Sequence, residues 1–499
     1  MVVRTPGGAY VEPESYDATV TVLGRDGAAA EPMRSFVYDQ ATGTQRTLVF
    51  HGNVARIRLP KGRWNLCTEI YDGEDHSLTI AHQPFEIDDA DVSLTVHGPK
   101  ARQITFTVDD PTAVPGRGFS LSMVNGPLVI GMSAYGYSGG VHVVPVRQPG
   151  FAYLAQTAWT KKGATPTPYR YDLVDYRKGG FPDNPGYTAR TRDMVKAIET
   201  YRSSVPGATG GLHTGPVIPG SDLPGGMGAS DVPLPSRLTR YLTPGFAWID
   251  EFDTDGLVEL GTGPVRDRDF TQVWNAAVTG SSFAASGGSR TGDTLDFPAN
   301  GLYTSGTAGR TGMDATVTGT LTLAGNGKEI AKTDITGCIA YESEECSLTA
   351  TLPTADTAYT LTVSSRRPEA GLSTGVDAVW TFHSARTAKP EPLPLMAVRY
   401  APQGLDDANR AKPGSQTTVP IWVERAPGAR GAAVSSITLE TSADDGRTWR
   451  PVRVRATRSG WTARLGNPAA PGYVSLRATV TDKAGNGVTQ TVTRAYAVG

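Results

Sequence analysis

The sequence predicts an all-β protein of three to four immunoglobulin-like or fibronectin-like β-sandwich modules in series, with one short helix. Glycine (58 residues) and proline (36) are abundant, and this is the composition of many short strands joined by turns. Apolar and polar residues alternate with a period of two along much of the chain. A length of 499 residues suits about three or four domains.

The first half of the chain predicts two β-rich domains. Over residues 1–100 we expect a β-sandwich, because alternating apolar runs are separated by turns such as Pro60–Gly62. Over 101–239 we expect a β-rich domain that carries two irregular features. The charged stretch TARTRDMVKAIETYRSS (188–204) predicts the short helix, and the Gly/Pro-rich stretch 206–236 predicts a long loop or linker with a solvated His213.

The second half predicts two further sandwiches, over 240–390 and 391–499. Within the first of them, the Gly/Ser-rich segment 280–292 predicts a loop, and TAKPEPLP (387–394) predicts an interdomain linker. The last sandwich has the clearest alternation, in YVSLRATVTDKAGNG, where the turn at 482–487 follows a strand with one apolar face. A Cys…Trp…Cys signature is absent, so a true immunoglobulin domain is not indicated.

The chain has three cysteines. Cys338 and Cys346 flank IAYESEE between two strand-like runs, and a hairpin would bring them within bridging range, as suits a secreted protein. The alternative is that the pair begins a zinc site, but it lacks a nearby His or third Cys. Cys67 is predicted to be a half-buried small apolar residue rather than a reactive thiol.

One short motif stands out in the last predicted sandwich. Residues 442–449 fit S-x-D-x-G-x-T-W and resemble the Asp-box of sialidase propellers. A propeller carries one motif per blade, whereas this chain has a single copy. The residue types instead predict a hairpin turn, in which the Asp accepts backbone N–H groups, the Gly adopts a positive φ and the Trp packs beside the turn. The five motif residues are Ser442, Asp444, Gly446, Thr448 and Trp449.

Two short segments partly match a catalytic or a metal-binding motif. Gly280–Ala284 fits the G-x-S-x-A nucleophile motif of subtilases, but Ser286 stands where that family has Pro, so we expect a solvated Ser/Gly loop. Asp253–Gly256 resembles the start of a calcium loop, but Pro264 occupies the place of the bidentate Glu, so we expect a turn. The seven histidines match no zinc spacing. We assign no catalytic residue, cofactor or metal.

Charge and hydropathy limit the partners. With 47 basic and 49 acidic residues, the net charge of −2 gives no electrostatic reason to expect nucleic acid or an anionic membrane. No apolar run is long enough to span a bilayer. The first residues, MVVRTPGGAYVEPES, are not a signal peptide, so the chain is either cytosolic or a piece whose export signal lies upstream.

Several stretches together resemble the long non-catalytic C-terminal region of large secreted subtilisin-like serine proteases from actinobacteria. They are VWNAAVTG (273–280), RTGDTLDFP (290–298), VDAVWTFHSA (376–385), LPLMAVRYAPQGLDDANRAKPGSQTTVPIWVER (393–425), the Asp-box hairpin and VSLRATVTDKAGNGVTQTVTRAY (474–496). The resemblance covers about 240–499 well and the N-terminal half more loosely. It implies a secreted parent with a protease domain ahead of these modules. That protease domain is missing from this chain, so no catalytic residue is carried over.

Three function classes follow from the sequence. The first is a non-catalytic accessory region of a secreted subtilase, which stabilises or spaces the protease, or holds it to substrate or cell surface. The second is a stand-alone extracellular protein that binds polysaccharide or protein, which tryptophans exposed on one sheet face would favour. The third, weakest class is a glycosidase. The expected partners are an upstream protease domain or an extracellular protein or polysaccharide.

Overall fold

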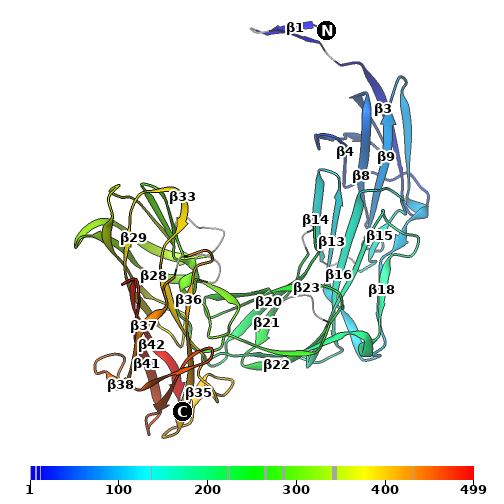
Figure 1. Ribbon diagram of the computed structural model, residues 1–499. Coiled ribbons are helices and arrows are strands. Elements are labelled where there is room, and N and C mark those ends of the chain that lie inside the picture. Colours follow the sequence, from blue (N-terminus) through cyan, green and yellow to red (C-terminus); the bar gives the residue numbers. More distant parts are fainter. Residues whose placement is uncertain are drawn as a thin grey trace.

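The computed structural model describes residues 2–5, 8–11, 13–135, 138–221, 223, 225–262, 267–283, 287–339, 346–429 and 431–499. Within these residues the chain is built almost entirely of β-strands, as predicted. The molecule is elongated and bent (Figure 1), with its first sandwich at one end and the C-terminal sheets at the other. The helical elements described are the short 3₁₀ turns η1 (Gly98–Lys100), η2 (Thr191–Asp193) and η3 (Asn300–Leu302).

The first sandwich packs a four-stranded sheet on a six-stranded one. The strands of the first sheet are β10 (Val92–His97), β3 (Ser15–Leu23), β7 (Val54–Pro60) and β6 (Phe50–His51). Those of the second are β11 (Arg102–Gln103), β15 (Val141–Val143), β9 (Ser77–Ile87), β8 (Gly62–Asp72), β4 (Arg34–Asp39) and β5 (Gln45–Thr47). Val20, Trp64 and Leu66 are among the buried residues between them. The hairpin β1 (Val2–Thr5) and β2 (Gly8–Val11) forms a separate two-stranded sheet.

A seven-stranded sheet forms the middle of the molecule. Its strands are β14 (Leu128–Tyr135), β13 (Ala113–Asn125), β16 (Phe151–Lys161), β17 (Tyr169–Lys178), β22 (Ser236–Leu242), β19 (Val195–Tyr201) and β25 (Phe270–Trp274). The short strands β12 (Thr105–Val108) and β18 (Gly186–Ala189) form a separate two-stranded parallel sheet. Tyr38 and Cys67 of the first sandwich share one core with Leu121 and Phe151 of the seven-stranded sheet, so the two parts are fused rather than linked.

A thirteen-stranded sheet runs from residue 209 to residue 498. Its main path is β21 (Met227–Pro233), β20 (Thr209–Val217), β23 (Ala247–Thr254), β24 (Leu257–Thr262), β28 (Arg310–Gly325), β31 (Thr357–Arg366), β32 (Gly375–Ser384), β42 (Gly487–Val498), β41 (Gly472–Asp482), β37 (Val434–Ser442) and β38 (Arg450–Val452). Off this path, β29 (Lys328–Cys338) pairs with β28, and β35 (Arg410–Ala411) pairs with β42.

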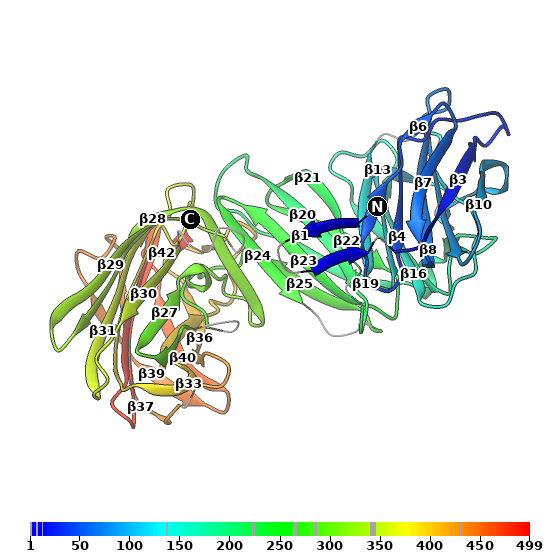
Figure 2. The same cartoon turned by 90° about the horizontal axis from the view of Figure 1, so that it is seen from above.

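Two four-stranded sheets pack against the C-terminal part of this long sheet (Figure 2). One contains β30 (Ser347–Thr351), β27 (Thr294–Pro298), β26 (Ser289–Gly292) and β33 (Thr387–Pro392). The other contains β34 (Met396–Tyr400), β36 (Gln416–Arg425), β40 (Gly460–Gly466) and β39 (Val454–Thr457). A single continuous core from Leu257 to Val498 joins them.

The predicted helix at 188–204 is wrong. This stretch contains η2 and the strand β19, which pairs with β22 and β25. Val195, Ala197, Glu199 and Tyr201 alternate toward the core, and this period of two is that of a strand. Glu199 misleads the sequence reading because it is a charged residue on the buried face, where Arg240 pairs with it.

Two predicted loops are also wrong. Much of 206–236 forms β20 and β21, in which glycines leave room for neighbours: a Cβ on Gly210 would lie 2.7 Å from the Phe252 ring. Residues 222 and 224 lie outside the described chain. The predicted linker 387–394 forms β33, an edge strand paired with β26, where proline costs no ladder hydrogen bond.

The predicted domain boundaries stay predictions, and main-chain pairing crosses each of them. Strands β15 and β9 pair across the boundary predicted near residue 100. Strands β19 and β25 pair across the boundary near residue 240, and β32 and β42 pair across the boundary near residue 390.

Candidate functional site

The two predicted partner cysteines form a disulfide. Cys338 ends β29, its Cα lies 5.2 Å from that of Cys346, and both residues are buried. Residues 340–345 between them lie outside the described chain. Cys67 is fully buried, more deeply than predicted, and burial raises the pKa of its thiol to about 12. A protonated, enclosed thiol is an inert packing group.

The motif at 442–449 forms the turn between β37 and β38. Asp444 Oδ1 accepts hydrogen bonds from Ser442 Oγ (2.6 Å) and the Thr448 amide (2.9 Å), and its Oδ2 accepts one from Thr448 Oγ1 (2.6 Å). These bonds hold the pKa of the Asp444 carboxyl well below its usual range. Gly446 has a φ of +86° and lies against half-buried Trp449. The geometry matches the predicted turn mechanism, while the link to Asp-boxes remains a resemblance.

The G-x-S-x-A segment is buried, not solvated as expected. Ser281 and Ser282 are at most 3% exposed, and Ala284 lies outside the described chain. Ser282 Oγ donates to Glu424 Oε2 (2.6 Å), and the Phe283 amide donates to the same atom (3.2 Å). This contact fastens the segment to β36 rather than presenting a nucleophile to solvent.

The Asp253–Gly256 segment is the turn between β23 and β24, as expected. Asp255 and Gly256 have φ values of 53° and 78°, typical of a tight hairpin turn. Pro264 lies outside the described chain. Among the described residues, no group of three or more His, Cys, Asp or Glu side chains is arranged to hold a metal ion.

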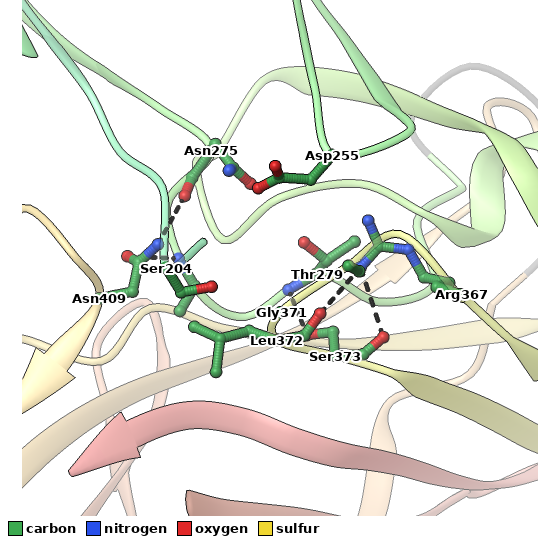
Figure 3. Close-up of a pocket in the computed structure, with 11 residues that line it drawn as sticks. Ser204, Asp255, Asn275, Thr279, Arg367, Gly371, Leu372, Ser373 and Asn409 are labelled. Atoms are coloured by element: carbon green, nitrogen blue, oxygen red, sulfur yellow. Dashed lines mark hydrogen bonds between the residues drawn. The ribbon is translucent and has the colours of Figure 1, made fainter. Parts of the chain in front are cut away.

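A polar joint lies where the middle of the molecule meets the C-terminal sheets (Figure 3). Its cavity of about 20 Å³ has room for about one water molecule, so it is not a substrate site. Asn409 is the central residue: its Nδ2 donates to the Asn275 carbonyl (2.9 Å), and its Oδ1 accepts from the Ala277 amide (3.1 Å) and Arg202 (3.2 Å). The cavity is lined by Ser204, Asp255, Asn275, Ala277, Thr279, Arg367, Ala370, Gly371, Leu372, Ser373 and Asn409.

A second polar contact ties β34 to two loops. The buried Arg399 guanidinium donates to the carbonyl oxygens of Gly280 (3.0 Å), Ser281 (3.1 Å) and Thr304 (3.1 Å), and also to that of Ser305. Burial lowers the pKa of Arg399 to about 10. The guanidinium thus satisfies buried carbonyl groups that would otherwise lack donors.

A buried ionic cluster, which sequence reasoning missed, fills the core beside β22. Arg240 donates to Asp172 (2.9 Å), Glu199 (3.1 Å) and Asp250 (2.9 Å), and Arg170 donates to Asp172 (2.7 Å). Burial raises the pKa of Glu199 against the pull of Arg240. The guanidinium groups of Arg170 and Arg240 thus face three carboxyl groups in this cluster. The available signal was charge at alternating positions, as in Arg170 and Asp172 of YRYDLVDY.

The tryptophans form no exposed stacking surface. Trp64, Trp248, Trp274 and Trp380 are buried, and the other four (Trp159, Trp422, Trp449 and Trp461) are half-buried. Sugar stacking on exposed indole rings, the feature expected of a carbohydrate-binding module, is therefore not favoured. His213 is exposed, as predicted. No helix of the described residues is long and apolar enough to cross a membrane.

Comparisons with known proteins show no relative by sequence. No protein-family model matches the chain, and no curated protein matches it. Solved structures give distant likenesses, among them a streptococcal ancillary pilin (9% identity; 52% of this chain and 99% of that chain covered; TM-score 0.13). Others are chicken CNTN1 FN1–FN3 domains (10%; 68% and 94%; 0.14) and Escherichia coli alpha-2-macroglobulin (9%; 100% and 42%; 0.19). At such TM-scores no function is transferred, and the fold class rests on the strand pairing itself.

Proposed function

We propose that this chain is a non-catalytic extracellular region that acts as a rigid spacer or accessory unit of a larger secreted protein. The observation that carries the proposal is how its parts are joined. The first residues of β28 pair with β24, and its later residues pair with β31. Strand β42 lies between β32 and β41 and pairs with both of them. Shared strands and a shared core resist bending, unlike the flexible interfaces that are the default between domains.

The disulfide supports the extracellular placement. Cys338 and Cys346 are bridged inside the core, and such bridges persist in oxidising compartments. Peptide mapping of exported protein is expected to recover the two cysteines as one linked pair. Recovery of both as free thiols would contradict export through an oxidising route.

We propose further that the parent protein is a secreted subtilisin-like serine protease. This rests on the stretches between residues 273 and 496 that resemble the C-terminal region of such proteases. In this role the fused β-sheets of this chain set the distance between the protease and its substrate or the cell surface. The second candidate is a stand-alone binding protein, which the charged surface described in the next subsection favours.

The deciding measurement is the intact mass and N-terminal peptide of the native product from its source culture. A larger species that continues upstream of Met1 and labels with a serine-hydrolase probe is the expected result. A species that begins near Met1 and does not label would contradict the protease parent and leave the stand-alone binding protein.

A further inference from the structure

Positive charge is concentrated at the C-terminal end of the chain. Residues 395–499 contain 12 arginines and 2 lysines against 5 aspartates and 2 glutamates, a formal charge of +7, while the whole chain carries −2. The near-neutral total therefore hides a strong asymmetry. Net charge alone does not exclude an anionic partner when the charge is distributed this way.

Arg430 lies outside the described residues, and the other eleven arginines of this region fall into two groups. Five of them meet a carboxylate: Arg399, Arg410, Arg425, Arg477 and Arg494 lie within 4 Å of Glu424, Asp406, Asp482, Glu440 and Asp445 respectively. The other group is exposed, and none of its members forms a salt bridge to any described residue. This second group contains Arg447, in the turn at 442–449, and five arginines that follow it, which we call the arginine patch: Arg450, Arg453, Arg455, Arg458 and Arg464.

Strand pairing places two members of the arginine patch, Arg455 and Arg464, on one face of a sheet. Val454 packs on the core, and its neighbour Arg455 in β39 is exposed. Arg453, between β38 and β39, is also exposed. Arg455 lies opposite Thr462 of β40, and Arg464, two residues further along β40, lies on the same face. Strands β36, β40 and β39 are adjacent in this sheet (Figure 2).

This arrangement opposes stability. Arg453 directly precedes β39, and continuing the register of the Val454–Ala463 pair would set it opposite Arg464, where like charges are destabilising. Charged residues on edge strands also prevent aggregation, and β39 is such an edge. Edge protection does not explain Arg464, because β40 lies inside the sheet between β36 and β39. A ligand with complementary charge does explain it.

We infer that the arginine patch binds an anionic polysaccharide. Guanidinium groups pair with carboxylate, sulfate or phosphate groups through two parallel hydrogen bonds. The patch also presents the hydroxyl groups of Thr457, Ser459 and Thr462, which suit sugar hydroxyls. Trp422 and Trp461 of the same sheet are half-buried, whereas single-stranded nucleic acid is held by bases stacked on accessible aromatic rings. The choice of a polysaccharide rests on the proposed extracellular role.

The test compares dextran sulfate, polygalacturonate and uncharged dextran as ligands of the full chain. We expect salt-sensitive binding of the two anionic polymers and no binding of dextran. The triple variant R453Q/R455Q/R464Q is expected to bind about tenfold more weakly, because three exposed cations that would pair with the polymer are lost. Its melting temperature is expected to stay the same or rise, because these arginines have no partner to lose.

A charge-matched control separates the patch from net charge. The variant R58Q/R192Q/R366Q removes three arginines that are 64%, 76% and 62% exposed elsewhere in the chain, and it is expected to bind like the wild type. Equal loss in both variants, equal binding of dextran and dextran sulfate, or absence of binding to either anionic polymer would overturn the inference. Tighter binding of single-stranded DNA would overturn the polysaccharide assignment. None of these results touches the spacer proposal, which intact mass tests.

Discussion

The buried Arg240 donates hydrogen bonds to three buried carboxyl groups. Without Arg240, these carboxyl groups would lose the cation that they share in the core. We predict that Arg240→Met lowers the free energy of unfolding by about 3–5 kcal/mol, because removing one partner leaves buried charges unpaired. Glu199→Gln is expected to cost less than Arg240→Met, because burial disfavours the charged carboxylate and raises its pKa, and the amide oxygen still accepts a bond from Arg240. Urea unfolding followed by tryptophan fluorescence measures both. Equal losses would show that Glu199 is ionised in the folded protein.

His82 makes the contact between the first sandwich and the seven-stranded sheet sensitive to acid. Its ring stacks on Phe151 (4.7 Å between centroids), and its Nε2 lies 3.0 Å from Tyr38 Oη and 2.9 Å from Asn125 Nδ2. Burial lowers the pKa of His82 to about 4, while Cys67 opposite it stays neutral because burial raises its pKa to about 12.

The direction of the pH dependence follows from this shift. Above pH 6.5 the ring is neutral in both states and its contribution is complete. As the pH falls from 6.5 to 4, the unfolded chain takes up the proton first, so the protein loses about 3 kcal/mol of stability. We predict that His82→Gln removes this part of the acid sensitivity between pH 7 and pH 4, measured by urea unfolding at both values. An unchanged difference would place the acid-sensitive group elsewhere.

At the scale of elements, the hairpin at 442–449 depends on one carboxylate. We predict that Asp444→Ala speeds hydrogen exchange at the Gly446 and Thr448 amides, because the bonds that fix Ser442 and Thr448 are lost. Amide exchange measured by NMR tests this. Thr448→Val, which removes one hydroxyl bond and keeps the amide bond, is expected to have a smaller effect. Equal exchange in wild type and Asp444→Ala would mean that strand pairing alone sets the turn.

The elements that sequence predicts well are those whose two faces differ in polarity. In 474–481 the alternating residues Val474, Leu476, Ala478 and Val480 are buried, and the strand and its turn are confirmed, although Ser475 beside a register shift is buried as well. Sequence reasoning fails where polar groups face inward or small residues permit close packing. The strand β19 is missed because Glu199 is a charged residue on its buried face. The strand β20 is missed because of its glycines, and β33 because of its prolines. The ionic cluster and the joint at Asn409 depend on contacts between distant segments, which periodicity does not encode.

At the scale of the whole molecule, shape depends on a few joints between fused sheets. The C-terminal body shares one core, whereas its contact with the middle of the molecule includes a small polar joint (Figure 3). Asn409 contributes side-chain bonds to Asn275, Ala277 and Arg202 there, and Arg237 meets Asp407 nearby. In the proposed spacer, this joint adds to the shared strands in holding the two parts together.

We therefore predict that Asn409→Gly loosens the molecule without unfolding its sheets. Glycine accepts the φ of 56° at this position, so the change removes the side-chain bonds and leaves the backbone unstrained. Small-angle scattering is expected to show a broader range of dimensions, and limited proteolysis a new site near residues 275–279. Asn326→Gly is the matched control, because Asn326 has a φ of 50° in the β28–β29 turn, away from the joint. If the two variants scatter alike, the shared strands alone hold the array rigid, and the polar joint is dispensable for its shape.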